Sequence, residues 1–270
     1  MFSSQTDLSV GFQRMASAKR ADNRSLPFPI VSEGNGWLVV DKPAGMTVHN
    51  HPGADVCSLV SSALASEPSL QDSVVSVNPV HRLDKETSGI LLLATTAEAF
   101  RFLARQFESG KVRKQYTAIL HGNLADPLKA DPWGVWKWPL AKAAGGRRHP
   151  QGSGKRHSAE TRYRILDRSR RYALVEIDLR TGRKHQIRRH AKLAGHGVVG
   201  DARYGSKRAA AYLRTERAFD RLALHSYGMT IGFPESGKPE TITTTKIPEE
   251  MRVLFRKDQI DQRVARGAAK

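Results

Sequence analysis

The sequence predicts an α+β fold with a mixed, largely antiparallel sheet and flanking helices. Apolar runs of strand length occur both singly and in succession along the 270 residues, and helical patterns separate them irregularly. There is no internal repeat and no strict alternation of strand and helix, which argues against a parallel βαβ array. With 39% hydrophobic and 26% charged residues, the chain has the composition of an ordinary globular protein.

Each expected element follows from a local pattern. Short apolar runs bounded by Gly, Pro or polar residues predict strands, and apolar residues three or four apart predict helices. We expect strands at residues 37–41, 89–95, 116–120, 162–166, 172–179, 222–231 and 240–244, and helices at 57–67, 96–108, 187–194 and 248–255.

The net charge of +18 resides mainly in the predicted folded body, residues 31–255. Residues 1–30, expected to be a flexible basic arm, carry +2, and the basic tail at 256–270 carries +3, which leaves +13 on the body. A folded body this basic typically binds a polyanion, because neutralising phosphates releases counterions. The alternative is a basic surface that serves only solubility.

The chain offers no sign of a membrane or an oxidising compartment. No apolar stretch is long enough to span a bilayer, and the first twenty residues lack the apolar core of a secretory signal. A single cysteine, Cys57, excludes an intrachain disulfide, and its apolar helical setting indicates a small buried residue. We therefore expect a cytoplasmic protein.

The segment from His81 to Ile90 (HRLDKETSGI) places one carboxylate, Asp84, beside Arg82 and Lys85 at the start of an apolar strand. A carboxylate among cations can act as a nucleophile or a base. The alternative is a turn in which polar side chains bond the local backbone.

A second segment, residues 179–192, carries six Lys or Arg after Leu179 and no acid. If residues 184–194 are helical, Lys184, Arg188 and Lys192 form one stripe suited to a phosphate backbone. Arg183 would then lie at the start of the helix, free to meet a carboxylate. The alternative is a solvated helical face.

Other candidate sites fail on spacing. The Gly-rich basic loop at 141–157 lacks the Gly and the Ser or Thr that a phosphate loop needs, since His149 and Arg156 occupy those positions. The histidines do not follow the three- or four-residue spacing of a helical zinc site. This spacing gives no indication of a zinc site.

Several motifs together resemble the ordered series of RluA-type pseudouridine synthases. They are DKPAG at 41–45, HRLDKETSG at 81–89, KQYTA at 114–118, LRTGRKHQIR at 179–188, GD at 200–201 with YG at 204–205, and LH at 224–225 with FP at 233–234. The resemblance spans residues 37–234 and implies a pseudouridine synthase catalytic domain over 31–255, without the S4-like domain of many relatives.

The resemblance also implies roles by position. Asp84 would be the catalytic aspartate, attacking either the anomeric carbon or the base, and Tyr116 would stack beneath the base and assist proton removal. Arg183 would pair with Asp84, and Arg82 would fill the gap left by the flipped uridine.

The resemblance implies no metal and no organic cofactor. The implied substrate is rRNA or tRNA, bound by a protein expected to be a monomer. A non-catalytic RNA-binding protein would need none of Asp84, Tyr116 and Arg183 together, and a nuclease would need clustered acids or paired histidines.

Overall fold

The computed structural model describes residues 26–66, 76–127 and 131–267, with side chains in the last helix described as far as Asp261. The strands are β1 (Ile30–Gly34), β2 (Trp37–Lys42), β3 (Asn78–Pro79), β4 (Ser88–Ala94), β5 (Arg113–His121), β6 (Gly134–Trp136), β7 (Leu140–Ala141), β8 (Arg156–His157), β9 (Thr161–Arg168), β10 (Tyr172–Leu179), β11 (Leu224–Gly232) and β12 (Pro239–Thr243). The helices are α1 (Val56–Ala65), α2 (Ala97–Glu108), α3 (Gln186–Leu193), α4 (Lys207–Arg217) and α5 (Glu249–Gly267).

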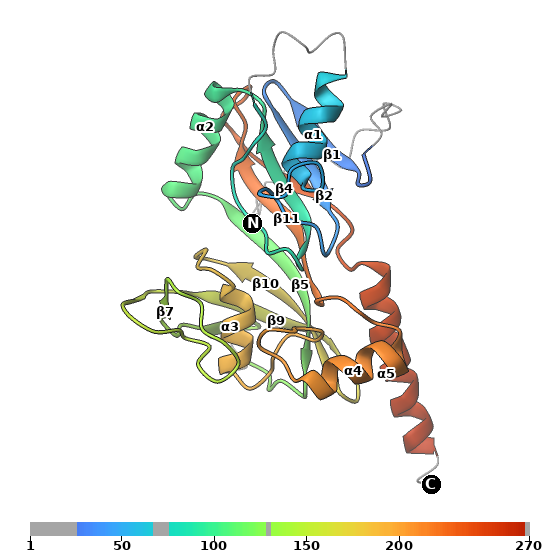
Figure 1. Ribbon diagram of the computed structural model, residues 1–270. Coiled ribbons are helices and arrows are strands. Elements are labelled where there is room, and N and C mark those ends of the chain that lie inside the picture. The colour runs from blue at the N-terminus through green and yellow to red at the C-terminus, as the bar shows by residue number, and fades with distance from the viewer. Residues whose placement is uncertain (1–25, 67–75, 128–130, 268–270) are drawn as a thin grey trace, which may run out of the picture.

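One ten-stranded sheet runs through the molecule (Figure 1). Its main path is β1-β2-β4-β11-β5-β10-β9-β6, with β12 beside β11 and β3 beside β4. Of its described pairings only β4 with β11 is parallel. The predicted mixed, largely antiparallel sheet is therefore confirmed.

The apolar run of β4 is buried on both faces. Leu91 and Leu93 point toward α1, whereas Ile90 and Leu92 belong to the core on the α2 side, together with Leu103. Because alternate residues of a strand face opposite sides, two covering helices require a continuous apolar run in place of alternation.

At the other half of the sheet, α3 packs Ile187 and Ala191 into the core, and α5 contributes Leu254 and Phe255. Figure 1 shows α3 beside β9 and β10, and α5 running away from the sheet next to α4. The strands β5 and β10 thus lie between layers that fix their positions.

The structure differs from the predicted boundaries at both ends. Phe28 is buried and β1 begins at Ile30, so the predicted arm of residues 1–30 is packed at its end, while residues 1–25 lie outside the described part. Helix α5 continues past residue 255 because Asp258 and Asp261 bond Arg171 and Arg217. Within the described ranges no helix could cross a membrane.

Candidate active site

Asp84 lies in the turn that leads into β4. The Thr87 amide donates to the Asp84 carbonyl at 3.1 Å, and a buried lysine, Lys42, holds the turn from behind. Its Nζ donates to the carbonyls of Lys85 at 3.1 Å, Met46 at 2.8 Å and Pro43 at 2.9 Å. Burial lowers the pKa of Lys42 to about 8, although Asp84 and Glu86 act to raise it.

The glycine after the turn allows the close approach of two strands. Gly89 has φ +112°, and a Cβ there would lie 2.1 Å from the Ser226 carbonyl oxygen of β11. A side chain would therefore prevent the parallel pairing of β4 with β11. This pairing brings β11, and β5 beyond it, next to Asp84.

His81, three residues before Asp84, is a structural residue. Its Nε2 accepts a hydrogen bond from the Leu92 amide at 3.1 Å, and its ring stacks on Phe107 with centroids 5.2 Å apart. Burial lowers the pKa of His81 to about 3, so the ring is neutral at physiological pH. His81 therefore adds no charge near Asp84.

A cavity of about 450 Å³ opens at Asp84. The turn supplies Arg82 and Leu83, β5 supplies Tyr116, and the segment that leads into α3 supplies Arg183 and His185. The apolar part of the lining comes from several elements and consists of Val80, Leu83, Phe107, Leu179, Ile187 and Leu224.

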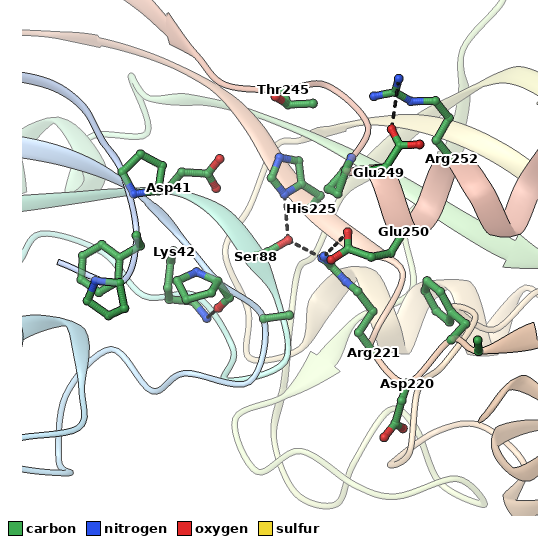
Figure 2. A pocket seen from close by; sticks show the side chains of 18 residues that line it. Asp41, Lys42, Ser88, Asp220, Arg221, His225, Thr245, Glu249, Glu250 and Arg252 are labelled. Atoms are coloured by element: carbon green, nitrogen blue, oxygen red, sulfur yellow. Dashed lines mark hydrogen bonds and ion pairs between the residues drawn. The ribbon is translucent and has the colours of Figure 1, made fainter. Parts of the chain in front are cut away.

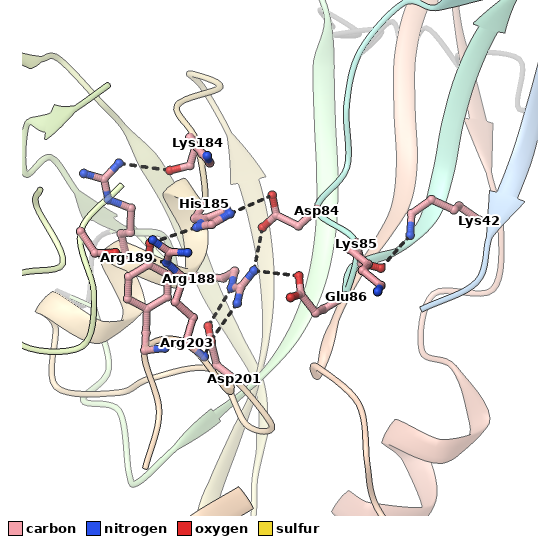
Figure 3. Close-up of polar contacts among 12 residues, drawn as sticks. Lys42, Asp84, Lys85, Glu86, Lys184, His185, Arg188, Arg189, Asp201 and Arg203 are labelled. Atoms are coloured by element: carbon pink, nitrogen blue, oxygen red, sulfur yellow. Dashed lines mark hydrogen bonds and ion pairs between the residues drawn. The ribbon is translucent and has the colours of Figure 1, made fainter. Parts of the chain in front are cut away.

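Arg188 is the arginine that pairs with Asp84 (Figure 3). Its Nη1 lies 3.1 Å from Asp84 Oδ2 and 3.1 Å from Glu86 Oε2. On its other side, Nε and Nη2 form a fork with Asp201 at 2.8 and 2.9 Å. Burial acts to lower the pKa of Arg188, but these three carboxylates raise it above its usual value.

The predicted pairing of Arg183 with Asp84 is wrong. Arg183 is exposed, and its Nε donates to the Ser158 carbonyl at 3.1 Å. Helix α3 begins only at Gln186, whose side chain accepts from the Arg183 amide at 3.0 Å, so residue 183 lies outside the helix. The first turn of α3 instead directs Arg188 toward Asp84.

The predicted basic stripe is also corrected by this geometry. Arg188 is 1% exposed and cannot reach a phosphate, because Asp84, Glu86 and Asp201 surround its guanidinium. Lys184 is exposed but precedes the helix, and Lys192 is half-buried. Arg82 is exposed at the edge of the cavity, as its predicted role requires.

Tyr116 lies on β5 with its ring in the cavity wall and 6% exposed. Its neighbours across the sheet are Ser226 on β11 and Ile177 on β10. Burial, with Asp84 adding to it, raises the pKa of Tyr116 to about 12. The phenol therefore holds its proton at neutral pH, which makes it a donor and a weak base.

Comparison with known proteins identifies this arrangement. The sequence profile described as RNA pseudouridylate synthase matches residues 36–193. The chain belongs to the RNA pseudouridylate synthase family. Ribosomal large subunit pseudouridine synthase D of Zymomonas mobilis is 36% identical over 248 residues, covering 89% of this chain and 75% of that protein. The Xanthomonas campestris protein of the same name is 34% identical over 238 residues, covering 86% and 70%.

Solved structures agree on the fold of the synthase. Human RNA Pseudouridylate Synthase Domain Containing 4 superimposes with a TM-score of 0.66 at 21% identity, over 84% of this chain and 92% of that one. Human RNA Pseudouridylate Synthase Domain Containing 1 gives 0.62 at 22% identity, over 81% and 83%. The resemblance seen in the motifs is confirmed, and the protein is an isomerase that acts on RNA.

A second cavity of the synthase, about 710 Å³, lies behind the Asp84 turn between β4, β11 and the start of α5 (Figure 2). Ser88 Oγ accepts a hydrogen bond from Arg221 and shares a second hydrogen bond, of 2.8 Å, with His225 Nδ1. Burial lowers the pKa of His225 to about 4. These bonds fix the first residue of β4 and thereby the end of the turn.

In the described part of the synthase no group of three His, Cys, Asp or Glu side chains could hold a metal ion. The buried carboxylate Asp201 is fully used by Arg188 and by the amides of Arg203 and Tyr204, at 2.9 and 3.0 Å. Burial acts to raise its pKa, but the Arg188 bonds lower it below the usual value. The signal that could have found Asp201 is its place in the GD motif, which the resemblance left without a role.

Proposed function

We propose that this synthase isomerises uridines in ribosomal RNA, with Asp84 as its catalytic carboxylate. The observation that carries the proposal is the position of the Asp84 side chain, 24% exposed at the cavity and bonded by Arg188. The relatives named above as ribosomal large subunit synthases support rRNA as the substrate class.

The reaction breaks the bond from C1′ to N1 of uracil, turns the base and joins C1′ to C5. N1 gains a proton and C5 loses one, so no oxidant, reductant or cofactor is consumed. Asp84 acts as the nucleophile toward the flipped nucleotide, while the apolar wall of Leu179, Ile187 and Leu224 contacts the base. The protonated Tyr116 lies at the same wall and serves as a hydrogen-bond donor to the base.

Flipping requires contacts that offset the loss of stacking. Arg82 stands exposed at the edge of the cavity and is suited to fill the space that the uridine leaves. Arg183 and Lys184 are also exposed beside the opening, where they can contact the flanking phosphates.

A basic hairpin extends this surface away from the cavity. Residues 141–157 run from the end of β7 through a loop into β8, and the cations in this segment are all exposed, namely Lys142, Arg147, Arg148, Lys155 and Arg156. Buried Arg189 donates to the carbonyls of Ala141 at 3.1 Å, Pro150 and Gln151, and Arg203 donates to that of Ala144 at 3.0 Å. The hairpin is therefore held in place by α3, the helix that carries Arg188. Its cations can contact phosphates of an RNA that is bound at the cavity.

The test is a reaction of the purified protein with transcribed large-subunit rRNA, and separately with transcribed tRNA, followed by mass spectrometry of the nucleosides. We expect pseudouridine in the rRNA only, and none with Asp84→Asn. Pseudouridine in tRNA alone would overturn the proposal that rRNA is the substrate. As much pseudouridine with Asp84→Asn as with the wild type would overturn the proposed role of Asp84. We also expect a monomer in the cytoplasm, which sedimentation and cell fractionation test.

A further inference from the structure

His185 occupies a backbone conformation that its helix does not explain. It is the N-cap residue of α3 with φ 53° and ψ 30°, in the left-handed region, and it gives the helix no side-chain cap bond. N-cap positions usually hold Ser, Thr, Asp or Asn in an extended conformation with such a bond. Residues with a strained backbone are frequent at functional sites, and this points to a role for the His185 side chain.

The His185 imidazole faces Asp84 on one side (Figure 3). On its other side it contacts the hydroxyl of a buried tyrosine, Tyr204. His185 Nδ1 lies 3.0 Å from the Tyr204 hydroxyl, and Nε2 lies 3.7 Å from Asp84 Oδ1. Arg188 bonds the other oxygen, Oδ2, at 3.1 Å. The two oxygens of Asp84 thus have different partners, a guanidinium on one side and an imidazole on the other.

The contacts favour one tautomer. Asp84 Oδ1 lies 3.7 Å from Nε2, beyond hydrogen-bond length, but its negative charge favours a proton on the nitrogen that faces it, which leaves Nδ1 of the neutral ring as an acceptor for Tyr204. Burial lowers the pKa of His185, and so do Arg188, Arg203 and Lys184, against the opposing effect of Asp84. Burial raises the pKa of Tyr204, so the hydroxyl keeps the proton that it donates.

Tyr204 has a fixed position for this task. It is 1% exposed, and the guanidinium groups of Arg188 and Arg203 lie 5.5 and 5.8 Å from its ring centroid. Its ring meets that of His185 edge-on, with centroids 5.8 Å apart. Neither residue can turn freely while the core around Asp201 is intact.

We propose that His185 is a positioning residue for Asp84, held by Tyr204 in the tautomer whose Nε2–H faces Oδ1. This rests on the proposed function of Asp84. Arg188 and His185 together restrict the rotation of the carboxylate. At 3.7 Å the His185 contact is longer than a hydrogen bond, so Oδ1 keeps its lone pairs available. Oδ1 is therefore the oxygen that attacks the flipped nucleotide.

The geometry is tested without activity, by nitrogen NMR of the full chain with labelled histidines. The His185 signals are assigned by their loss in His185→Gln. We expect the Nε2–H tautomer in the wild type and a mixture of tautomers in Tyr204→Phe. Asp84→Asn should move the His185 titration to lower pH, because it removes the one charge that favours the imidazolium. An Nδ1–H tautomer, or a titration that Asp84→Asn leaves unchanged, would overturn the proposal.

The role is tested by single-turnover rates at saturating protein. His185→Ala should lower the rate by about 100-fold with unchanged RNA affinity, as a misplaced reacting group does. His185→Gln supplies an uncharged N–H in a similar place and should recover most of that loss. His51→Gln, on an exposed loop outside the cavity, is the matched control and should behave as the wild type.

A merely structural role would lower stability and affinity in both His185 variants alike. Equal rates for His185→Ala and His185→Gln would therefore overturn the proposal. A wild-type protein that makes no pseudouridine would refute the proposed function instead, and the NMR arms would still decide whether His185 faces Asp84.

Discussion

Arg188 joins Asp84 to Asp201 through one guanidinium. The fork to Asp201 is buried, with both side chains 2% exposed or less, whereas Asp84 remains 24% exposed. The orientation of Arg188 is therefore set by the core, and only Nη1 remains to bond Asp84 and Glu86. The Asp84 carboxylate, which lies on a turn, is in this way positioned by the packing of α3 and the loop that follows it.

Arg188→Lys should lower the single-turnover rate by about 100-fold and leave RNA affinity unchanged. A lysine keeps the charge, but it cannot bond both oxygens of Asp201 and still reach Asp84. Rapid-quench rates and filter binding measure the two quantities. The control is Arg101→Lys, because Arg101 forms an exposed ion pair with Glu98 on α2. Arg183→Lys should lower the rate far less, and the reverse order of the two variants would contradict the assigned pairing.

Asp84→Asn should abolish turnover with little change in stability. The side chain is partly exposed, and Arg188 keeps Asp201 and Glu86 when Asp84 loses its charge. The Asn carboxamide keeps the shape of the side chain and its oxygen can still accept from Arg188, so the melting temperature should shift by only a few degrees. The matched control is Asp220→Asn, because Asp220 forms a mostly exposed ion pair with Arg214. A folded Asp84→Asn protein that forms pseudouridine would exclude Asp84 as the nucleophile.

Lys42→Met should reveal the low pKa of the lysine behind the Asp84 turn. The folded pKa of about 8 lies below the ordinary value of 10.5, so between these pH values the unfolded chain binds more protons. The wild type should therefore gain stability relative to Lys42→Met as pH rises through this range, by at most about 1.4 kcal/mol per pH unit. Urea unfolding of both proteins at pH 7 to 10 measures it, and parallel curves would disprove the shift.

The central strands β2, β4, β10 and β11 could be predicted because they are buried along most of their length. The run Ile90–Leu93 packs into the cores on both sides of the sheet, which leaves a continuous apolar stretch that is visible in the sequence. Helix α4 was missed because Leu213 is its only buried residue among polar neighbours. Its Ala-rich composition was the available signal.

The site could be predicted in its residue types but not in its pairing. Arg183 and Arg188 belong to the same basic motif, and nothing local shows which of them is buried. The choice depends on Asp201, which supplies the second half of the fork from another segment. It also depends on the left-handed conformation of His185, a backbone state that sequence patterns rarely indicate for a residue other than Gly.

The basic hairpin provides the last prediction, which separates RNA binding from chemistry. If Arg147 and Arg148 contact phosphates, Arg147→Ala with Arg148→Ala should lower the slope of log affinity against log salt by about two, and Lys184→Ala by about one. Lys238→Ala, an exposed lysine on the turn between β11 and β12, should leave the slope unchanged.

The rate of bound substrate is the second measurement on the same proteins. None of these cations contacts Asp84 or Arg188 in the described part of the chain, so single-turnover rates at saturating protein should stay near the wild type. A slope unchanged in the double variant would show that the hairpin is only a solvated surface. A rate that collapses at saturation would place the hairpin in the catalytic group, acting through Arg189 and the helix that also carries Arg188.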